Sequence, residues 1–450
     1  MRLSSKFLPI AFLITSIVLL IVKKIPVLNL PHYWDEAFPY SYAIGYMSQN
    51  GSSLLSDCAP SLHTTGHPLL YYFMQSTWNN IVGNVIWMER LFPMIVSILI
   101  LIFTYLIGKK LHSKSAGGIA TILLSTQSSF LSQASFQLPE TMLTLFLLMS
   151  IYYTFTNKKW PFVLVATGMV FTKETGVILL FILFLNFIIS SYNKTERIPF
   201  IKSTWIYVTP IALNFLFYLH QYYVQGWFFF PRHTGFIISD IDPVFDQFSR
   251  YFANLFIFEG RNMIFFAMLI ITTIIGISRW KAMKIVSLNH SILILISLII
   301  GFLTFSAFNF YSDRYILCLF PIFVILASLS ITALFKKRVW ISSALGLGLT
   351  LITFAKSYTN TKPTDHSLGY SDAVITQMNA INYCVNMKWQ KKSIQTGFLT
   401  SKNLTSHYPR YLERDQLFSN VNKTNSSPEL IIISNNEIEE HLMKKINNFY

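Results

Sequence analysis

Long apolar runs, separated by short polar segments, occupy most of the chain. A helix needs about 20 apolar residues to cross a bilayer core about 30 Å thick. By this measure the pattern predicts about eleven spans, near residues 7–22, 87–107, 115–133, 139–156, 160–172, 176–192, 203–221, 262–278, 290–310, 314–335 and 339–356. We therefore predict an all-α polytopic membrane protein whose transmembrane domain covers residues 1–356, with a long first outer loop at residues 23–86.

Composition agrees with this prediction and excludes other classes. Of the 450 residues 53% are hydrophobic and only 12% are charged, whereas a soluble domain has about a quarter charged residues. A soluble globular enzyme is therefore excluded. The net charge of +15 would suit a nucleic-acid partner, but most of the positive excess lies in short loops between apolar runs. Such loops are typical of multispanning membrane proteins, so we expect the lipid bilayer as partner and no nucleic acid.

The basic residues also predict an orientation. With the N-terminus in the cytoplasm, 16 of the 25 Lys and Arg residues before position 357 lie on the inner side, and Lys23 and Lys24 are the clear exceptions. Of the 12 acidic residues in the same part, only Glu196 lies inside. Longer outer loops explain part of this asymmetry, and a functional site on the outer face is the interpretation that we favour.

The last 94 residues read as ordinary soluble protein, with 10 basic and 8 acidic residues. An odd number of spans places this segment, residues 357–450, outside the cytoplasm. Pro363 marks a turn, the pattern predicts a strand at Leu430–Ser434, and Glu437–Asn447 has the pattern of an amphipathic helix. We predict a small extracytoplasmic α/β module.

Two adjacent carboxylates, Asp35 and Glu36, stand beside Tyr33 and Trp34 in the first outer loop. Ionisable groups close to a membrane are often functional. The two side chains point different ways on any regular backbone, so one could face a substrate while the other binds a cation or a backbone donor. The alternative is a solvated interfacial turn with aromatic residues of the membrane belt.

Other charged and aromatic residues recur at the outer ends of different predicted spans. Each has a simple explanation, such as a snorkelling turn for Lys173 or a local ion pair between Asp313 and Arg314. Together they predict a cleft for an anionic, polar substrate that enters from the bilayer. The further candidate residues are His63, His67, Tyr71, Glu140, Lys173, Arg232 and Arg314.

Several short motifs, in this order and on one predicted side, resemble the GT-C superfamily of membrane glycosyltransferases. They are Trp34-Asp35-Glu36-Ala37, His67-Pro68-Leu69-Leu70-Tyr71-Tyr72, Glu89-Arg90-Leu91-Phe92-Pro93, Leu138-Pro139-Glu140, Phe171-Thr172-Lys173-Glu174-Thr175-Gly176 and Asp313-Arg314-Tyr315-Ile316-Leu317. The resemblance covers about residues 1–335 and is strongest to the bacterial branch related to aminoarabinose transferases and protein O-mannosyltransferases.

The resemblance implies a polyprenyl-phosphate sugar as donor, used on the outer face of the cell (inner) membrane. The acceptor would be a hydroxyl of a glycan, lipid or protein, and the displacement would be inverting. Because a hydroxyl has too high a pKa to attack unaided, a carboxylate must take its proton; Asp35 is our candidate, with Glu36 in support. Lys173, Arg314, Arg232 and His67 are available for the leaving phosphate. No complete set of metal ligands is recognisable, which leaves a divalent metal cofactor open.

The main alternative is a transporter or flippase for a lipid-linked or anionic solute. Transporters tend to place ionisable residues at the middle of the membrane, in broken helices and within internal repeats. Here the charges lie at outer helix ends and the sequence shows no repeat, so we favour the glycosyltransferase. The sugar, the acceptor and the oligomeric state are not determined by the sequence.

Overall fold

A computed structural model describes residues 4–83, 85–192, 197–280, 290–335, 338–359, 362–422 and 428–432. The helices up to the last predicted span are α1 (Ser4–Lys24), α2 (Tyr40–Asn50), α3 (Ser61–Thr64), α4 (Leu70–Val82), α5 (Ile86–Glu89), α6 (Leu91–Leu111), α7 (Lys114–Leu124), α8 (Ser128–Gln133), α9 (Pro139–Phe155), α10 (Lys159–Thr172), α11 (Thr175–Tyr192), α12 (Arg197–Gln225), α13 (Pro231–Thr234), α14 (Ile241–Phe256), α15 (Arg261–Trp280), α16 (His290–Ala307), α17 (Leu319–Phe335) and α18 (Val339–Thr359). Short 3-10 turns are η1 (Ile25–Val27), η2 (Trp34–Glu36), η3 (Phe258–Gly260), η4 (Asp313–Ile316) and η5 (Arg414–Gln416).

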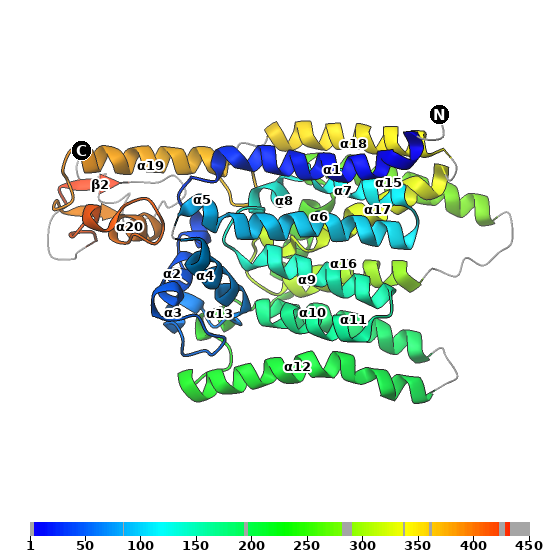
Figure 1. Ribbon diagram of the computed structural model, residues 1–450, viewed down its shortest axis with the longest axis horizontal. Coiled ribbons are helices and arrows are strands. Elements are labelled where there is room, and N and C mark those ends of the chain that lie inside the picture. The colour runs from blue at the N-terminus through cyan, green and yellow to red at the C-terminus, as the bar shows by residue number, and fades with distance from the viewer. Residues whose placement is uncertain are drawn as a thin grey trace.

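The long helices lie roughly side by side, and the remaining elements gather at one end of them (Figure 1). At this end lie α2 to α5 of the first predicted outer loop, together with α13 and the C-terminal segment, whereas the N-terminus lies at the opposite end. The loop and the tail therefore share one side of the helix layer. Which side of a membrane this is remains a prediction.

Every predicted span contains a helix, with three differences in continuity. The span expected at 115–133 is divided into α7 and α8, because the polar run Ser125–Gln127 interrupts it. The span expected at 87–107 is divided into α5 and α6, and the one expected at 314–335 into η4 and α17. Among the described residues, five helices are long and apolar enough to cross a membrane: Phe7–Val27, Ile86–Leu111, Phe258–Ile277, His290–Ala307 and Val339–Thr359. The described residues are thus mostly helical with several candidate spans, and the count of eleven stays a prediction.

Glycines allow the central helices to approach closely. A Cβ atom added at Gly108 of α6 would lie 2.9 Å from the Cα atom of Gly117 in α7, and one added at Gly118 would lie 2.8 Å from the Cα atom of Pro9 in α1. Lipid offers no hydrophobic drive between helices, so such close packing of small residues is an important source of stability. It fixes the helix layer on which the outer segments are built.

The C-terminal segment contains α19 (Tyr370–Asn386), α20 (Phe398–Thr405) and a small parallel sheet of β1 (Ile394–Thr396) and β2 (Leu430–Ile432). The strand predicted from Leu430 therefore begins where it was expected. The helix predicted at Glu437–Asn447 lies outside the described residues.

Buried polar contacts attach this segment to the helix layer. Arg410 pairs with Glu89 at the end of α5, and the Tyr33 hydroxyl donates to the Pro363 carbonyl at 2.6 Å. Lys24 donates through Nζ to the Ser132 carbonyl at 2.8 Å and to the Tyr370 hydroxyl at 3.2 Å. The Lys24 side chain is held by these hydrogen bonds inside the protein. This explains why Lys24 is an exception to the predicted excess of Lys and Arg in the inner loops.

Candidate functional site

A cavity of about 330 Å³ lies where the outer segments meet the helix layer. Six of the sequence-predicted residues line it: Asp35, His67, Glu140, Lys173, Arg232 and Arg314. They come from the first outer loop, the start of α9, the turn between α10 and α11, the short helix α13 and the turn η4, so only the fold brings them together. Phenylalanines 302 and 305 of the candidate span α16 form part of an apolar wall.

The turn η2 separates the two adjacent carboxylates. Trp34 has φ 54°, which is uncommon for a bulky residue, and the turn leaves the Asp35 side chain 39% exposed at the cavity while that of Glu36 is fully buried. The expectation that the two side chains point different ways is confirmed. Glu36 does not line the cavity.

Glu36 holds the first outer loop instead. Its carboxylate accepts hydrogen bonds from the backbone N–H of Gln137 at 2.8 Å and of Tyr33 at 3.2 Å, and it pairs with Arg90 at 3.0 Å and with His32 at 3.2 Å. Burial alone would raise the pKa of Glu36, but Arg90 and His32 outweigh burial and lower this pKa to about 2. Glu36 is therefore an ionised anchor that binds backbone donors and a cation.

Arg314 is the centre of the charged cluster at the cavity. Its guanidinium pairs with Asp35, with Asp365 at 2.5 Å and with Glu140 at 3.3 Å. Glu140 Oε1 also accepts from Lys173 Nζ at 2.9 Å. Glu140 Oε2 is buried without a hydrogen-bond partner among the described residues, so this carboxylate keeps one oxygen for a further donor.

A tight turn between α10 and α11 places Lys173 and Glu174. A side chain at Gly176 would collide with the Met169 carbonyl oxygen, so only glycine permits this approach. Burial by itself lowers the pKa of Lys173, but Glu140 and Tyr315 outweigh burial and raise this pKa above its usual value. Lys173 is therefore a firmly charged ammonium group at the cavity.

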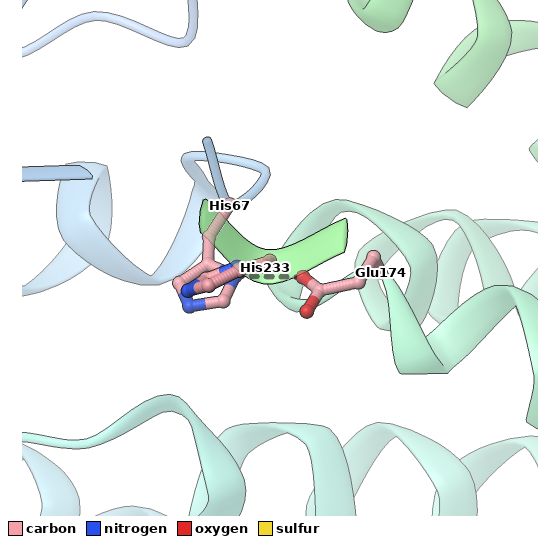
Figure 2. Close-up of side chains that lie close together, drawn as sticks. All are labelled: His67, Glu174 and His233. Carbon is pink, nitrogen blue, oxygen red and sulfur yellow. Dashed lines mark hydrogen bonds and ion pairs between the residues drawn. The ribbon is translucent and has the colours of Figure 1, made fainter. Parts of the chain in front are cut away.

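His67, Glu174 and His233 form a second cluster on the cavity wall (Figure 2). One nitrogen or oxygen atom of each lies within 4.8 Å of the others, and His67 Nδ1 lies 2.7 Å from Glu174 Oε2. Burial raises the pKa of Glu174, but His67 outweighs burial and lowers it to about 2, while burial lowers the pKa of His233 to about 4. A neutral imidazole and an ionised carboxylate are suitable ligands, and two His with one Glu is a set that zinc accepts.

Two further candidate residues, besides Glu36, are not brought to the cavity. Tyr71 is fully buried, and its hydroxyl contacts Gln75 Oε1 at 3.4 Å. His63 packs against the rings of Phe38 and Tyr42 and does not line the cavity. Both belong to the packing of the first outer loop in this structure.

Sequence reasoning missed Asp365 and His366, which follow α18 at the start of the predicted module. Asp365 pairs with Arg314, and His366 Nε2 lies 3.0 Å from Asp313 Oδ2. Burial lowers the pKa of His366, but Asp313 and Asp365 outweigh burial and raise it to about 9. The only signal was an Asp-His pair after the Lys362-Pro363 turn, and nothing in its spacing indicates a partner 51 residues earlier.

A family model described as dolichyl-phosphate-mannose-protein mannosyltransferase matches residues 66–223, which include His67, Glu140 and Lys173. A comparison with curated protein sequences gives no match.

The fold is similar to that of solved membrane-protein structures. ArnT from Cupriavidus metallidurans, bound to undecaprenyl phosphate, matches with a TM-score of 0.57 and 15% identity, over 84% of this chain and 71% of ArnT. The Archaeoglobus fulgidus oligosaccharyltransferase in complex with Zn and sulfate matches with a TM-score of 0.53 and 11% identity, over 95% of this chain and 62% of that protein. The same archaeal enzyme, AglB, matches equally in complex with an inhibitory peptide and a dolichol-phosphate.

Identities this low show a shared fold, and the segment matched by the family model carries three of the six predicted residues that line the cavity. The chain is therefore similar in fold to ArnT and to the archaeal oligosaccharyltransferase, and residues 66–223 are similar to the mannosyltransferase family model.

Proposed function

We propose that the chain transfers a sugar from a polyprenyl-phosphate donor to a hydroxyl acceptor, on the extracytoplasmic face of the cell membrane. The observation that carries the proposal is the cavity in which an accessible carboxylate, Asp35, lies beside the cations Arg314 and Lys173. A group-transfer reaction with an anionic leaving group needs both a base and positive charge.

The same cavity offers two chemically different surfaces, which suits an amphipathic donor. The wall of the cavity includes Lys173, Arg232 and His67 as well as Phe302 and Phe305 of the candidate span α16. The phosphate of the donor would bind the cations, and its polyprenyl chain would leave along the phenylalanines towards the bilayer. The matched ArnT structure, which contains undecaprenyl phosphate, supports this choice of donor.

In the proposed reaction the acceptor oxygen forms a bond to C1 of the sugar while the bond from C1 to the phosphate oxygen breaks. The electron pair of the broken bond stays on the polyprenyl phosphate, and Asp35 takes the proton of the acceptor hydroxyl. Lys173 and Arg314 stabilise the phosphate charge that develops. Attack from the side opposite to the phosphate inverts the configuration at C1, and no covalent sugar–enzyme intermediate forms.

The test is direct transfer. Membranes containing the protein are incubated with a panel of labelled undecaprenyl-phosphate sugars, and label is followed into the acceptor fraction. We expect one donor to give transfer in wild-type membranes and at least about 100-fold less in membranes with Asp35→Asn, which removes basicity at constant size. Undecaprenyl phosphate should bind both proteins. Uptake or flipping of the intact donor without cleavage would instead identify a transporter.

A further inference from the structure

A second cavity of about 500 Å³ adjoins the first. The two share Asp35 and Arg314, so the proposed base lies on the wall of both. The remaining wall of the second cavity includes Trp34 from the first outer loop and Tyr311 before η4. Leu399 of α20 completes it from the C-terminal segment.

The two cavities differ in charge. The first contains Lys173 and Arg232 in addition to the shared Arg314, and these three cations balance the carboxylates of Asp35, Glu140 and Glu174. In the second cavity two carboxylates outnumber the one cation. Among the described residues, the charged groups that line the second are Asp35, Arg314 and Asp365, and these pair with one another. The second cavity therefore offers no unpaired cation for a phosphate, and an anionic ligand there would meet two carboxylates.

The lining of the second cavity suits a neutral ring that carries hydroxyls. Trp34 presents a flat apolar surface with a polar tip, and Ser312 adds a polar group. Tyr311 lies on the wall with its ring packed against Tyr251 and Arg250 and its hydroxyl hydrogen-bonded to Asp313. Trp34 is 37% exposed and holds its left-handed backbone conformation directly before Asp35. A bulky residue in this conformation costs free energy, and such strain is concentrated at functional sites.

We infer that the second cavity is the acceptor subsite and that it receives a carbohydrate ring, with one hydroxyl directed to Asp35. The inference rests on the proposed function and assigns its acceptor class. The donor then occupies the first cavity and the acceptor the second, and Asp35 and Arg314 lie on the wall of both. Leu399 and Asp365 belong to the C-terminal segment, so this segment contributes to acceptor selection.

The decisive variant is Leu399→Trp, which fills the second cavity from the C-terminal side. Ile375→Trp is the matched control, because Ile375 is an exposed apolar residue of α19 that lines neither cavity. We measure the affinity for undecaprenyl phosphate and the transfer of labelled sugar to acceptor membranes. Leu399→Trp should keep the affinity within about twofold and lower transfer at least about tenfold, because blocking one subsite spares the other. The control should match wild type in both.

A second variant covers the case in which Leu399→Trp does not fold. Trp34→Ala should raise the amount of acceptor membrane needed for half-maximal transfer by about tenfold, and Trp34→Phe should restore most of it, because a ring face is retained. Normal transfer in both Leu399→Trp and Trp34→Ala overturns the acceptor assignment alone. A parallel loss of undecaprenyl-phosphate affinity assigns the cavity to the donor. A wild-type protein that neither binds undecaprenyl phosphate nor transfers sugar overturns the proposed function itself.

Discussion

Two buried arginine–carboxylate clusters, one containing Asp35 and the other its neighbour Glu36, have different surroundings. Arg90 donates to Glu36 and to the backbone carbonyls of Leu30, Pro31 and Ser135, so its partners belong to the packed first outer loop and to the turn between α8 and α9. Arg314 binds three carboxylates instead, and two of them line the first cavity. The first cluster is closed by the protein, and the second is open to a ligand. Access, more than charge, distinguishes an anchor from a candidate reaction site.

The largest expected effect contrasts the two neighbouring carboxylates. Asp35→Asn should lower transfer by about 100-fold or more, because the proton acceptor is lost. The protein should remain folded, because Asp35 is 39% exposed and Arg314 keeps Glu140 and Asp365 as partners. Glu36→Gln should instead destabilise the fold by about 3–5 kcal/mol, because Arg90 then remains buried beside a neutral partner. Activity per folded molecule, measured after size-exclusion chromatography, separates the two effects.

Asp35→Glu provides a control for position. One additional methylene moves the carboxylate by about 1 Å, and such a displacement alone can lower a rate by about 100-fold. If Asp35→Asn transfers sugar at the normal rate, another carboxylate acts as the base, and Glu140 is the next to test. Loss of transfer by folded Glu36→Gln would contradict its assignment as an anchor.

Smaller effects are expected when each arginine is replaced by lysine. Arg314→Lys should reduce transfer about tenfold or more, since an ammonium cannot reproduce a planar fork that contacts three carboxylates. Arg90→Lys should lower thermal stability and leave the turnover of the folded protein close to that of wild type. Equal losses of turnover in the two variants would remove the distinction between the closed and the open cluster.

The comparison also shows what the sequence could and could not predict. Apolar runs predicted the helices well, because length and hydropathy are local properties. The divergence of Asp35 and Glu36 was also predictable, since it follows from backbone geometry. The pairing of Arg314 with Asp365 in the C-terminal segment could not be predicted. Both α17 and α18 lie between the two residues in the sequence, so only the folded chain brings them together. The role of Glu89 and Arg90 was likewise hidden, since their partners lie far away in the sequence: Arg410 for Glu89, and Glu36 and the Ser135 carbonyl for Arg90.

The same contrast applies to two clusters of His and Glu. His32 lies between Glu36 and Glu89, and Arg90 and Arg410 neutralise these acids. The group of His67, Glu174 and His233 lines the cavity. We expect a divalent ion to bind only the second group, since its three ligand atoms are close enough to share one ion.

Thermal unfolding with added Zn²⁺ checks this expectation. Zinc at 100 times its dissociation constant stabilises the folded state by about 2.7 kcal/mol, and His233→Ala should abolish this shift. His63→Ala is the matched control, because His63 lies among aromatic rings outside the group. An equal zinc shift in wild type and His233→Ala would exclude the site.

The smallest expected effect concerns pH and the open cluster. His366 faces Asp313 and Asp365, with Thr364 Oγ1 3.4 Å from its Nε2 atom, and its pKa is raised from 6.5 to about 9. A raised pKa stabilises the folded state fully below pH 6.5, and this contribution disappears as the pH rises through about 9. The melting temperature of wild type should therefore fall across this window, and that of His366→Gln should fall less. For a large domain each kcal/mol corresponds to about 2–4 °C.

Because Asp365 also holds Arg314, deprotonation of His366 should weaken the attachment of the C-terminal segment before it alters the base. An unchanged pH dependence in His366→Gln would place the titrating group elsewhere.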